Sequence, residues 1–565
     1  MQNFENFSWR PRGLAYLLLA VASCAASFFK IPDGDIWMHL AQGRYILEQG
    51  IVPAEDVFSF TYGGKPWINW EWLHNLLVSG IWTLGGWTGM ILFRILVVAT
   101  TITLLFSLVD RLCRNVWCSF FLSGMALLLI QTRINDRPHL LSYLLCAWLL
   151  AVVFPWPLLS RKQVLTLFLI MLLWRNVHPS WVIGFPIIIS CYLDAVFTKK
   201  EPFSGKVVAI LAALAPMVWL ITPHPHGLGS HVSLFVEGGA VLPEWRSLLV
   251  MEEYILSLEY LLFFFFMAIF FFAALRTGRK QFPLYSLLGV VVVGSVCFYV
   301  RFLPDAVLIG IPVVASWCAG FVPQPVVRER ILHMGVIFIF SLTVWGVQTL
   351  FGKLDRECGI GVDERRNPLF LGDLMKERQL GGNVYGSFPG TNDFLVFYLF
   401  PRVKVPIDIR VPGLYPYEYA EKLWVVRSDD EFQRHVLSLP LDYVIVGCPD
   451  AVAPLREHEK GIEESLRRRG WNLIYFDKRY ALYRRPGKED GMRPFMFLSR
   501  WNSAAEDVAE AVKSGSFDVV VHDMEMLKKL TKGRDDFYRE IFAMVYRLPC
   551  LTDEQRETLE KLFRD

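Results

Sequence analysis

Hydrophobic positions form long uninterrupted runs over roughly the first 350 residues, with short polar stretches between them. A helix needs about 20 mainly apolar residues to cross a bilayer, with a range of roughly 17 to 25. The runs that qualify or come close are 13–29, 89–109, 117–132, 139–158, 163–175, 180–197, 207–222, 255–275, 282–299, 303–321 and 331–350. The pattern therefore predicts a polytopic α-helical membrane protein with about eleven transmembrane helices.

Beyond residue 351 the pattern changes to short apolar strands and amphipathic helices. Strands are expected in NVYGSFPG, KVPIDIR, DYVIVGCP and NLIYFDKRYALYRRP, and helices over 417–437 and 453–469. This alternation is typical of a small α/β domain. The last segment is charged and helical, with Thr552 and Gln555 in capping-box spacing. We expect three domains: a transmembrane domain 1–351, an α/β domain 352–485 and a helical appendage 486–565.

Basic residues are distributed unevenly between alternate loops. Fourteen of them fall in the N-terminus and in every second connection, namely Arg10, Arg12, Arg111, Arg114, Arg161, Lys162, Lys199, Lys200, Lys206, Arg276, Arg279, Lys280, Arg328 and Arg330. The other short connections hold five, namely Arg133, Arg137, Arg175, Arg246 and Arg301. Because short cytoplasmic loops are rich in Lys and Arg, the N-terminus is expected in the cytoplasm. An odd number of helices then places the C-terminal domain in the periplasm or outside the cell, on an inner (cytoplasmic) membrane.

The long first outer loop, residues 30–88, is rich in tryptophan, with Trp37, Trp67, Trp70, Trp72, Trp82 and Trp87. Tryptophan favours the headgroup level of a bilayer, so we expect this loop to lie on the membrane surface. DIWMHLAQGRYILEQG has apolar positions at helical spacing and a terminal glycine, which indicates an interfacial helix with a C-cap. VSGIWTLGGW is a candidate for a second such helix.

Composition agrees with a membrane protein and excludes other classes. Hydrophobic residues make up 54% of the 565, and the mean hydropathy of +0.36 is too high for a soluble enzyme of this length. A net charge of +3 without a basic face gives no reason to expect a nucleic-acid partner. Most of the ten cysteines lie in or beside apolar segments, which predicts neither a disulfide framework nor a zinc site. An alternative for the N-terminus is a lipoprotein signal, because Val21-Ala22-Ser23-Cys24 resembles its cleavage box.

Ionisable residues gather at the predicted outer ends of the helices. An ionisable group near hydrocarbon is costly, so it tends to face a cavity or a partner. The candidates are Asp33, Asp35, His39, Arg44, Asp56, Glu71, Arg137, His139, His178, Glu244 and Arg301. Acids come mostly from the first loop and bases mostly from later ones, an arrangement in which arginines can bind a lipid-linked phosphate by charge-assisted hydrogen bonds.

Each candidate also has an ordinary structural interpretation. Asp33-Gly34-Asp35 resembles the DxD of nucleotide-sugar enzymes, a pattern that also occurs by chance, and Asp35 would suit the cap of the following helix. His39 and His178 fit interfacial histidines whose hydrogen bonds are satisfied. Glu71 fits an interface residue, and Arg301 could extend its side chain to the headgroups.

The sequence also resembles a known family. Residues 33–73, DGDIWMHLAQGRYILEQGIVPAEDVFSFTYGGKPWINWEWL, resemble the first loop of a poorly characterised bacterial group that looks like GT-C glycosyltransferases. Its relatives in architecture are protein O-mannosyltransferases, oligosaccharyltransferases and the lipid A aminoarabinose transferase. The resemblance continues in RPHLLSYLL, WRNVHPSWVIG, TPHPHG, PEWRS, VRFLPDAVLIGIP and KVPIDIRVPGLYP, and the tail 486–565 lies outside it.

The resemblance implies transfer of a sugar from a polyprenyl-phosphate donor to a protein, lipid or glycan acceptor on the outer face of the membrane. In this class a first-loop acid is the general base, and Asp35 matches it best, followed by Asp56 and Asp33. Arg137, Arg301 and His178 match positions that could hold the lipid phosphate. Some relatives use a divalent metal ion, but the sequence shows no specific ligand set. Two alternatives stay open: a flippase or transporter of lipid-linked glycans, and a non-catalytic membrane scaffold.

Overall fold

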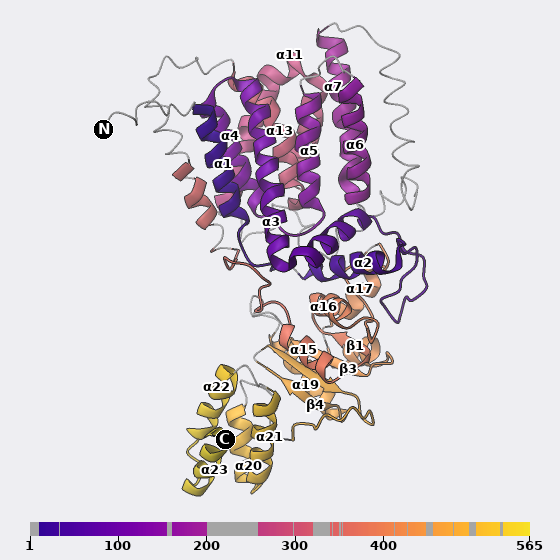
Figure 1. Cartoon of the computed structure of the whole chain (residues 1–565), viewed down its shortest axis with the longest axis vertical. Coiled ribbons are helices and arrows are strands. Elements are labelled where there is room, and N and C mark those ends of the chain that lie inside the picture. Colours follow the sequence, from indigo (N-terminus) through magenta and orange to yellow (C-terminus); the bar gives the residue numbers. More distant parts are fainter. Residues whose placement is uncertain are drawn as a thin grey trace, which may run out of the picture. The chain divides into compact units, whose positions relative to one another are not determined.

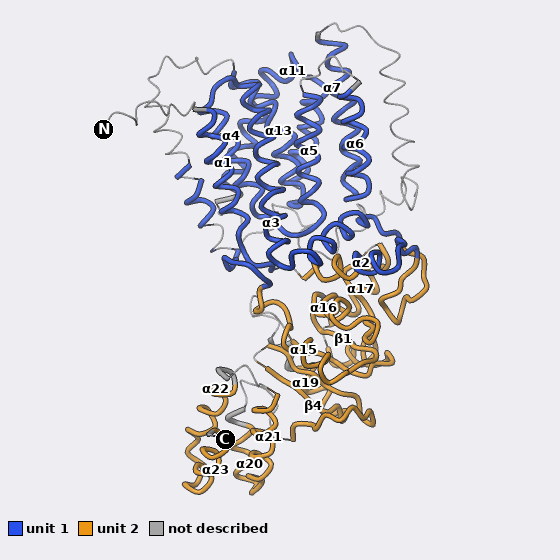
Figure 2. Tube along the Cα trace, in the orientation of Figure 1, with its two compact units in different colours: residues 1–32, 42–54, 68–362 blue, residues 33–41, 55–67, 363–565 orange. Residues whose placement is uncertain are grey.

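The computed structural model describes residues 11–32, 34–154, 161–199, 258–297, 299–319, 340–341, 343–349, 352, 354–411, 413–447, 456–477, 479–496, 504–530 and 535–564. The chain divides into two compact units (Figure 2). Unit 1 contains residues 1–32, 42–54 and 68–362, and unit 2 contains residues 33–41, 55–67 and 363–565. Two pieces of the first loop therefore fold with the C-terminal region.

Unit 1 is built from helices, several of which run side by side (Figure 1). They are α1 (Pro11–Ser27), α3 (Trp72–Cys113), α4 (Val116–Gln131), α5 (His139–Val153), α6 (Arg161–Val177), η1 (Pro179–Ile183), α7 (Gly184–Lys199), α10 (Leu258–Ala273), η5 (Ala274–Gly278), α11 (Arg279–Gln281), α12 (Pro283–Ser295), η6 (Val300–Phe302) and α13 (Leu303–Cys318). Helix α2 (Asp35–Gln49) begins in unit 2 and ends in unit 1.

Nine of the eleven predicted apolar segments coincide with helices in the described part of the chain. The segment 207–222 lies outside the described residues, and 331–350 is described only from residue 340 onward. Among the described helices, four are long and apolar enough to cross a membrane, namely Trp72–Cys113, Pro179–Thr198, Tyr260–Gln281 and Val300–Cys318. The membrane class is supported by these helices, and the total of eleven crossings stays a prediction.

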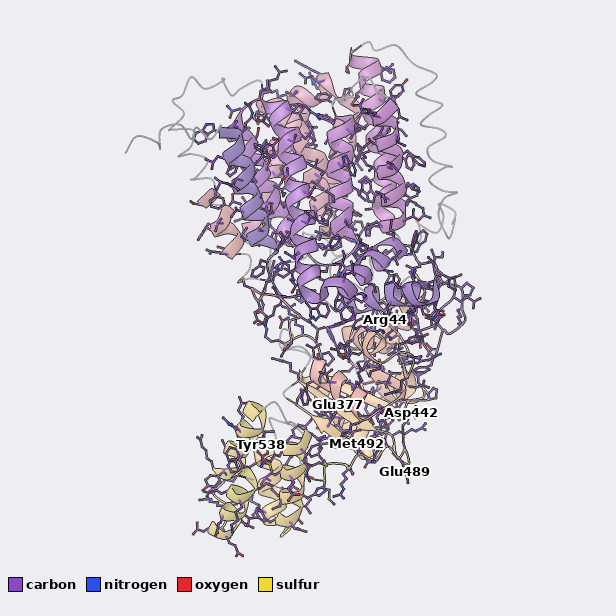
Figure 3. All side chains as sticks on the ribbon, in the orientation of Figure 1. Arg44, Glu377, Asp442, Glu489, Met492 and Tyr538 are labelled. Carbon is purple, nitrogen blue, oxygen red and sulfur yellow. The ribbon has the colours of Figure 1, made fainter. Side chains whose placement is uncertain are left out.

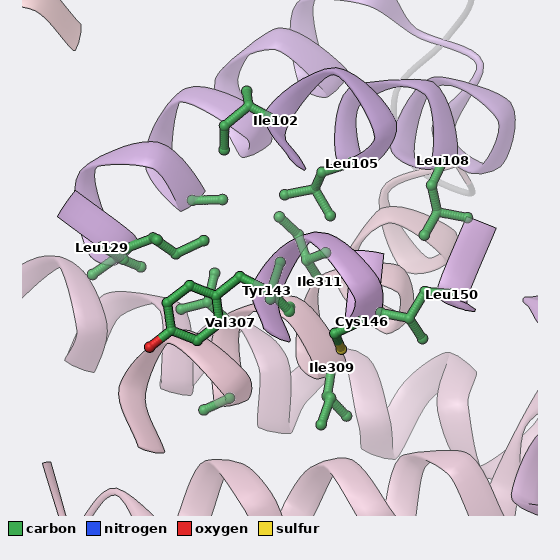
Figure 4. Close-up of a cluster of buried hydrophobic side chains, with 14 of the residues drawn as sticks. Ile102, Leu105, Leu108, Leu129, Tyr143, Cys146, Leu150, Val307, Ile309 and Ile311 are labelled. Carbon is green, nitrogen blue, oxygen red and sulfur yellow. The ribbon is translucent and has the colours of Figure 1, made fainter. Parts of the chain in front are cut away.

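The core of unit 1 is a continuous cluster of aliphatic and aromatic side chains between the helices (Figure 4). Figure 4 shows the part of this cluster where α3, α4, α5 and α13 meet, with Ile102, Leu105, Leu108, Leu129, Tyr143, Cys146, Leu150, Val307, Ile309 and Ile311. Burial of such side chains stabilises the packing, through close contacts as well as removal from water.

The predicted helix VSGIWTLGGW is present as the end of the first arm of α3. A kink at Gly86 divides α3 into two arms, since this residue has φ +55° and ψ −148°. Glycine adopts this conformation without a steric penalty because it has no Cβ. The predicted helix DIWMHLAQGRYILEQG is confirmed as α2, which is followed by Gly50 with φ +69°.

Unit 2 contains a five-stranded sheet with strand order β2-β1-β3-β5-β4. Strand β1 pairs in parallel with β2 and β3, whereas β5 pairs antiparallel with β3 and β4. The elements are α15 (Leu369–Glu377), β1 (Gly382–Gly386), α16 (Pro389–Leu399), β2 (Val403–Lys404), α17 (Tyr417–Trp424), α18 (Asp429–Glu431), η7 (Phe432–Leu437), β3 (Tyr443–Gly447), α19 (Arg456–Arg468), β4 (Asn472–Phe476) and β5 (Tyr480–Arg484).

The predicted α/β pattern is confirmed, with two differences in length. KVPIDIR contributes only Lys404 to the two-residue strand β2, because Pro406 follows closely and has no N–H for a sheet. The predicted helix 417–437 is broken after Trp424, and a new helix starts at Asp429 with the hydroxyl of Ser428 as its N-cap.

In its described residues the C-terminal segment contains the helices α20 (Ala504–Lys513), α21 (Phe517–Leu530), α22 (Asp535–Tyr546) and α23 (Asp553–Arg564). The predicted capping box is present at the start of α23. The Thr552 N–H donates to Gln555 Oε1 at 2.9 Å, and the Gln555 N–H donates to Thr552 Oγ1 at 3.2 Å.

The first-loop pieces of unit 2 attach to the end of β2. Ser59 forms a parallel bridge with Val405, and the Phe60 N–H donates to the Val405 carbonyl at 3.1 Å. Trp37 and Trp67 are 0% and 6% exposed in this unit. The expectation that these two tryptophans lie among lipid headgroups is therefore wrong, because the protein itself covers their rings.

Candidate functional site

The structure describes nine of the eleven predicted site residues, whereas Asp33 and Glu244 lie outside the described residues. Asp35, His39 and Asp56 belong to unit 2; Arg44, Glu71, Arg137, His139, His178 and Arg301 belong to unit 1. Each group is considered within its own unit. A cleft that joins Asp35 to Arg301 stays a prediction.

Asp56 is held in a buried ion-pair network with Arg410 and Asp408. Arg410 Nη2 donates to Asp56 Oδ1 at 2.5 Å and to Asp408 Oδ2 at 2.6 Å, while Arg410 Nε donates to Asp408 Oδ1 at 2.8 Å. The backbone N–H groups of Phe58 and Ser59 and the hydroxyl of Ser59 also donate to Asp56. Both oxygens of Asp56 therefore accept two hydrogen bonds each.

This network determines the charge of its members. Burial by itself would raise the pKa of Asp56, but the charge of Arg410 and the hydrogen bonds from Ser59, Arg410 and Phe58 lower it below its usual value. Burial opposes the charge on Arg410, and the carboxylates of Asp408 and Asp56 outweigh burial and raise its pKa further. Asp56 is thus an ionised structural acid with its acceptor sites filled, a poor environment for a general base.

Aromatic rings enclose the guanidinium of Arg410. Its Cζ lies 4.6 Å from the ring centre of Trp67 and 5.2 Å from that of Phe58, both from the first loop. The hydroxyl of Tyr415 donates to Asp408 at 3.0 Å. Arg410 therefore joins the 55–67 piece of the first loop to the α/β domain through ion pairs and cation–π contacts.

Asp35 is the first residue of α2. Its neighbour Gly34 lies in close contact with Gly390 of α16. A Cβ on Gly34 would lie 3.1 Å from the Cα of Gly390, at the start of α16. Two residues after Asp35, the indole N–H of Trp37 donates to Asn367 Oδ1 at 2.5 Å. The Trp37 ring centre lies 5.1 Å from that of Phe394, on α16. These contacts fix the first turn of α2 against α16.

Asp393 on α16 is a fully buried acid that the sequence analysis did not select. The Ile409 N–H donates to its Oδ1 at 3.1 Å, and its Oδ2 has no hydrogen-bond partner among the described residues. Burial, followed by the charges of Asp408 and Asp35, raises the pKa of Asp393 well above its ordinary value. Burial therefore favours the protonated form of Asp393 over the charged form.

Unit 1 gathers a second group of predicted site residues, which we call the Arg/His cluster and define as Arg133, Arg137, His139, His178 and Arg301. His139 Nε2 donates to the Arg133 carbonyl at 2.9 Å, and the His139 and His178 ring centres are 6.5 Å apart. Arg137 is close enough to His139 to act on its charge. Arg133 and Arg301 both act on Asp305, at the start of α13. Basic residues from three separate segments, the α4–α5 connection, the end of α6 and η6, thus form this cluster.

The other predicted residues have local roles. His39 is buried in the first half of α2. Arg44, labelled in Figure 3, lies in the second half of the same helix and is half-buried. Burial lowers the pKa of Arg44, and the nearby Glu48 opposes this effect. The backbone carbonyl of Glu71 accepts the Asn75 N–H at 2.9 Å in the first turn of α3, while its side chain makes no capping hydrogen bond there.

Arg94, inside α3, is buried at the exit of α1. Its Nε donates to the Ser27 carbonyl at 2.9 Å, its Nη1 pairs with Asp136 at 2.6 Å, and its Nη2 donates to the Phe29 carbonyl. Its Cζ lies 3.8 Å from the ring centre of Phe29, and the Cζ of Arg356 lies 4.2 Å from the same ring. Two guanidinium groups therefore hold the segment that leads into the first loop.

A divalent metal ion finds little support in the donor set. In the part of the chain that the structure describes, no group of three or more His, Cys, Asp or Glu side chains is arranged to hold a metal ion. Asp408 and Asp56 are already saturated by Arg410 and other donors.

Solved structures of membrane enzymes share this arrangement of elements. The apo oligosaccharyltransferase of Archaeoglobus fulgidus is 11% identical over 87% of this chain and 76% of its own, with a TM-score of 0.56. AglB from the same organism, in complex with an inhibitory peptide and a dolichol-phosphate, is 12% identical over 78% and 70%, with a TM-score of 0.51. The chain has an oligosaccharyltransferase-like fold. This is the GT-C architecture that the sequence resemblance predicted.

Another similar structure is ArnT from Cupriavidus metallidurans bound to undecaprenyl phosphate, 12% identical over 83% of this chain and 97% of its own, with a TM-score of 0.44. No protein-family model matches the chain, and no curated protein matches it significantly. At these identities the similarity to the two archaeal structures establishes the fold alone.

Three residues of the oligosaccharyltransferase-like fold were missed by sequence reasoning. Arg410 lies in a recognised motif and Asp393 lies close to one. The pairing of Arg410 with Asp56 joins segments more than 300 residues apart and has no local signal. Arg94 had a detectable signal, since an ionised residue inside an apolar run is costly unless it is paired.

Proposed function

We propose that this chain is a membrane glycosyltransferase that moves a sugar from a polyprenyl-phosphate-linked donor to an acceptor on the outer face of the membrane. The observation that carries the proposal is the fold shared with an oligosaccharyltransferase over 87% of the chain. The dolichol-phosphate in the AglB complex supports a lipid phosphate as the carrier of the sugar. Asp35 is the general base in this proposal.

Asp35 is preferred to Asp56 because of their surroundings. Asp56 is saturated by Arg410, Ser59 and Phe58, so it has no open acceptor site for a substrate proton. Asp35 lies in the first turn of a helix, half-buried. A carboxylate in such partly apolar surroundings is a better base than one in water, because burial disfavours its charged form.

The Arg/His cluster has the chemistry that the leaving group requires. Asp35 removes a proton from an acceptor hydroxyl or amine, the new bond forms at the anomeric carbon, and the bond from that carbon to the phosphate oxygen breaks. The electron pair of the broken bond stays on the lipid phosphate. Arg133 and Arg301 can bind this phosphate bidentately and stabilise the negative charge that develops there.

The test uses the purified full chain in lipid nanodiscs with polyprenyl-phosphate-linked sugars that carry a radiolabel. Release of polyprenyl phosphate is measured together with the appearance of labelled product. Asp35→Asn is expected to lower the rate by roughly 10²- to 10⁴-fold, whereas the exposed Asp373→Asn has no effect. Arg301→Gln is expected to raise the KM for the donor, and the exposed Arg279→Gln serves as its control.

The proposal would be contradicted if no offered donor is turned over while intact lipid-linked glycan moves between the leaflets of nanodiscs or vesicles. That result would favour a flippase. Equal rates for wild type and Asp35→Asn would remove Asp35 from the mechanism.

A further inference from the structure

The surroundings of Asp35 are provided largely by the C-terminal part of the chain. Residues 33–41 fold in unit 2 with residues 363–565. The contact of Gly34 with Gly390 leaves no space for a side chain between the first turn of α2 and the start of α16. Trp37, which is 0% exposed, packs on Phe394 with ring centres 5.1 Å apart. The two helices therefore meet at a fixed place, close to their N-terminal ends.

Asp393 lies one turn into α16, next to this contact. It is 0% exposed, and only one of its oxygens has a hydrogen-bond partner among the described residues, the N–H of Ile409. An ionised carboxylate with an unsatisfied oxygen would be costly in such a position. A protonated carboxyl group avoids this cost, because its O–H can donate a hydrogen bond to a neighbouring acceptor.

Three charged groups on two elements act on Asp393: Asp35 from α2, and Asp408 and Arg410 from the segment after β2. Asp408 is a poor acceptor for the Asp393 proton, because it already accepts from the backbone and side chain of Arg410 and from the hydroxyl of Tyr415. Arg410 has donors only. Of the three, Asp35 is the group that could accept a proton from Asp393.

We propose that Asp393 holds a proton and donates it in a hydrogen bond to Asp35, and that it thereby positions the carboxylate of Asp35. This inference rests on the proposed function, in which Asp35 is the general base. Asp393 is a positioning residue: it contacts no substrate, and it orients one oxygen of Asp35 so that the other faces the acceptor. The C-terminal domain thus contributes a residue to the catalytic apparatus of the first loop.

Infrared difference spectroscopy tests the pair directly, because the C=O stretch of a protonated carboxyl is separate from the bands of carboxylates. The full chain is measured in nanodiscs at pH 7, with carbon-13-labelled aspartate to identify aspartyl bands. Asp393→Asn is expected to remove one protonated-aspartyl band. Asp35→Asn is expected to shift that band, because the acceptor changes from a carboxylate to an amide, whereas the exposed Asp373→Asn leaves it in place.

A band that persists in Asp393→Asn, or that does not move in Asp35→Asn, would overturn the inference. The Asp35→Asn measurement keeps Asp393 intact, so it decides the matter even where Asp393→Asn folds poorly. Turnover is not needed for this readout. If the band shifts but no sugar is transferred, the hydrogen bond between Asp393 and Asp35 is supported and the proposed function is contradicted. If sugar transfer depends on Asp35 but the band does not move, the proposed function is supported and the hydrogen bond is contradicted.

A second measurement separates positioning from mere packing. The amide of Asp393→Asn can donate to Asp35 as the protonated acid does, whereas Asp393→Leu cannot. Asp393→Leu is expected to lower kcat by roughly tenfold to a hundredfold and to move the acid limb of the pH–rate profile upward, because Asp35 loses a donor to its charged form. Asp393→Asn should keep a rate and profile close to wild type. Equal profiles for all three proteins would contradict the proposal.

Discussion

Arg410 Nη2 donates to Asp56 Oδ1 at 2.5 Å, although the two residues are 354 positions apart in the chain. Both side chains are at most 4% exposed, so the pair is dry as well as distant in sequence. It joins a loop between two N-terminal helices to the end of a strand in the C-terminal domain. The buried ion pair is stable because nearly every polar atom of Arg410 and Asp56 has a hydrogen-bond partner.

Arg410→Gln is expected to destabilise unit 2 by about 3–5 kcal/mol, because it leaves Asp56 and Asp408 buried without a counter-charge. The midpoint of chemical unfolding, followed by the fluorescence of the buried Trp37 and Trp67, measures the change. The exposed Arg402→Gln is the matched control and should alter the midpoint little. An unchanged midpoint in Arg410→Gln would show that the network contributes nothing to folding.

The raised pKa of Asp393 predicts that the stability of the folded chain declines as pH rises. Because its pKa is raised in the folded state, the native chain keeps a proton that the unfolded chain releases above about pH 4. Its contribution to stability is complete below the unfolded pKa and declines as pH rises toward the folded pKa. Asp393→Asn, which carries no titrating proton, should therefore gain stability relative to wild type between pH 5 and pH 8. A difference between the two proteins that is constant over this range would contradict the protonated state.

Arg94 predicts a large structural effect in unit 1. Arg94→Met leaves Asp136 buried and ionised without its partner, at a cost of about 3–5 kcal/mol. The double variant with Asp136→Leu is expected to recover part of this loss, because no unpaired charge is left. Resistance to thermal unfolding in detergent measures both, with Arg279→Gln as control. Equal loss in the single and double variants would assign the effect to the carbonyls of Ser27 and Phe29 alone.

Gly34→Val tests the contact that fixes the first turn of α2. A Cβ at this position lies 3.1 Å from the Cα of Gly390, so the helix or its partner must move. We expect a loss of about 1–3 kcal/mol and a greater loss of transferase turnover than stability alone explains. Gly461→Val, where a Cβ would have no neighbour within 4 Å, is the control for a glycine-to-valine change without a steric conflict. Turnover equal to that of Gly461→Val would show that Asp35 does not depend on this contact.

Local patterns in the sequence predicted most elements of the fold. The strands at 443–447 and 472–484, the helix α2 and the capping box at Thr552 all follow from periodicity or from spacing within a few residues. The differences arise where a tertiary contact overrides the local pattern. The apolar run that begins at Lys404 looks like a longer strand, but the strand ends there, and Arg410 further along pairs with both Asp56 and Asp408.

The candidate site was predictable in its residue types but not in its pairing. The family resemblance ranks Asp35 before Asp56 and Asp33 as the general base, but no local pattern shows how each acid is paired. Only the structure shows that Arg410 saturates Asp56, and that Asp35 has Asp393 as an acidic neighbour. Such pairings depend on contacts between segments hundreds of residues apart, and a single sequence carries no record of them.

The discontinuity of unit 2 has a consequence for biosynthesis. Residues 33–41 and 55–67 leave the ribosome about 300 residues before Asp363 does. At about 5–20 residues per second, this interval lasts on the order of 15–60 s. Throughout that time the indole rings of Trp37 and Trp67 lack the partners that later enclose them. In a nascent chain these two rings therefore stay without their final packing partners until the last third of the chain has been translated.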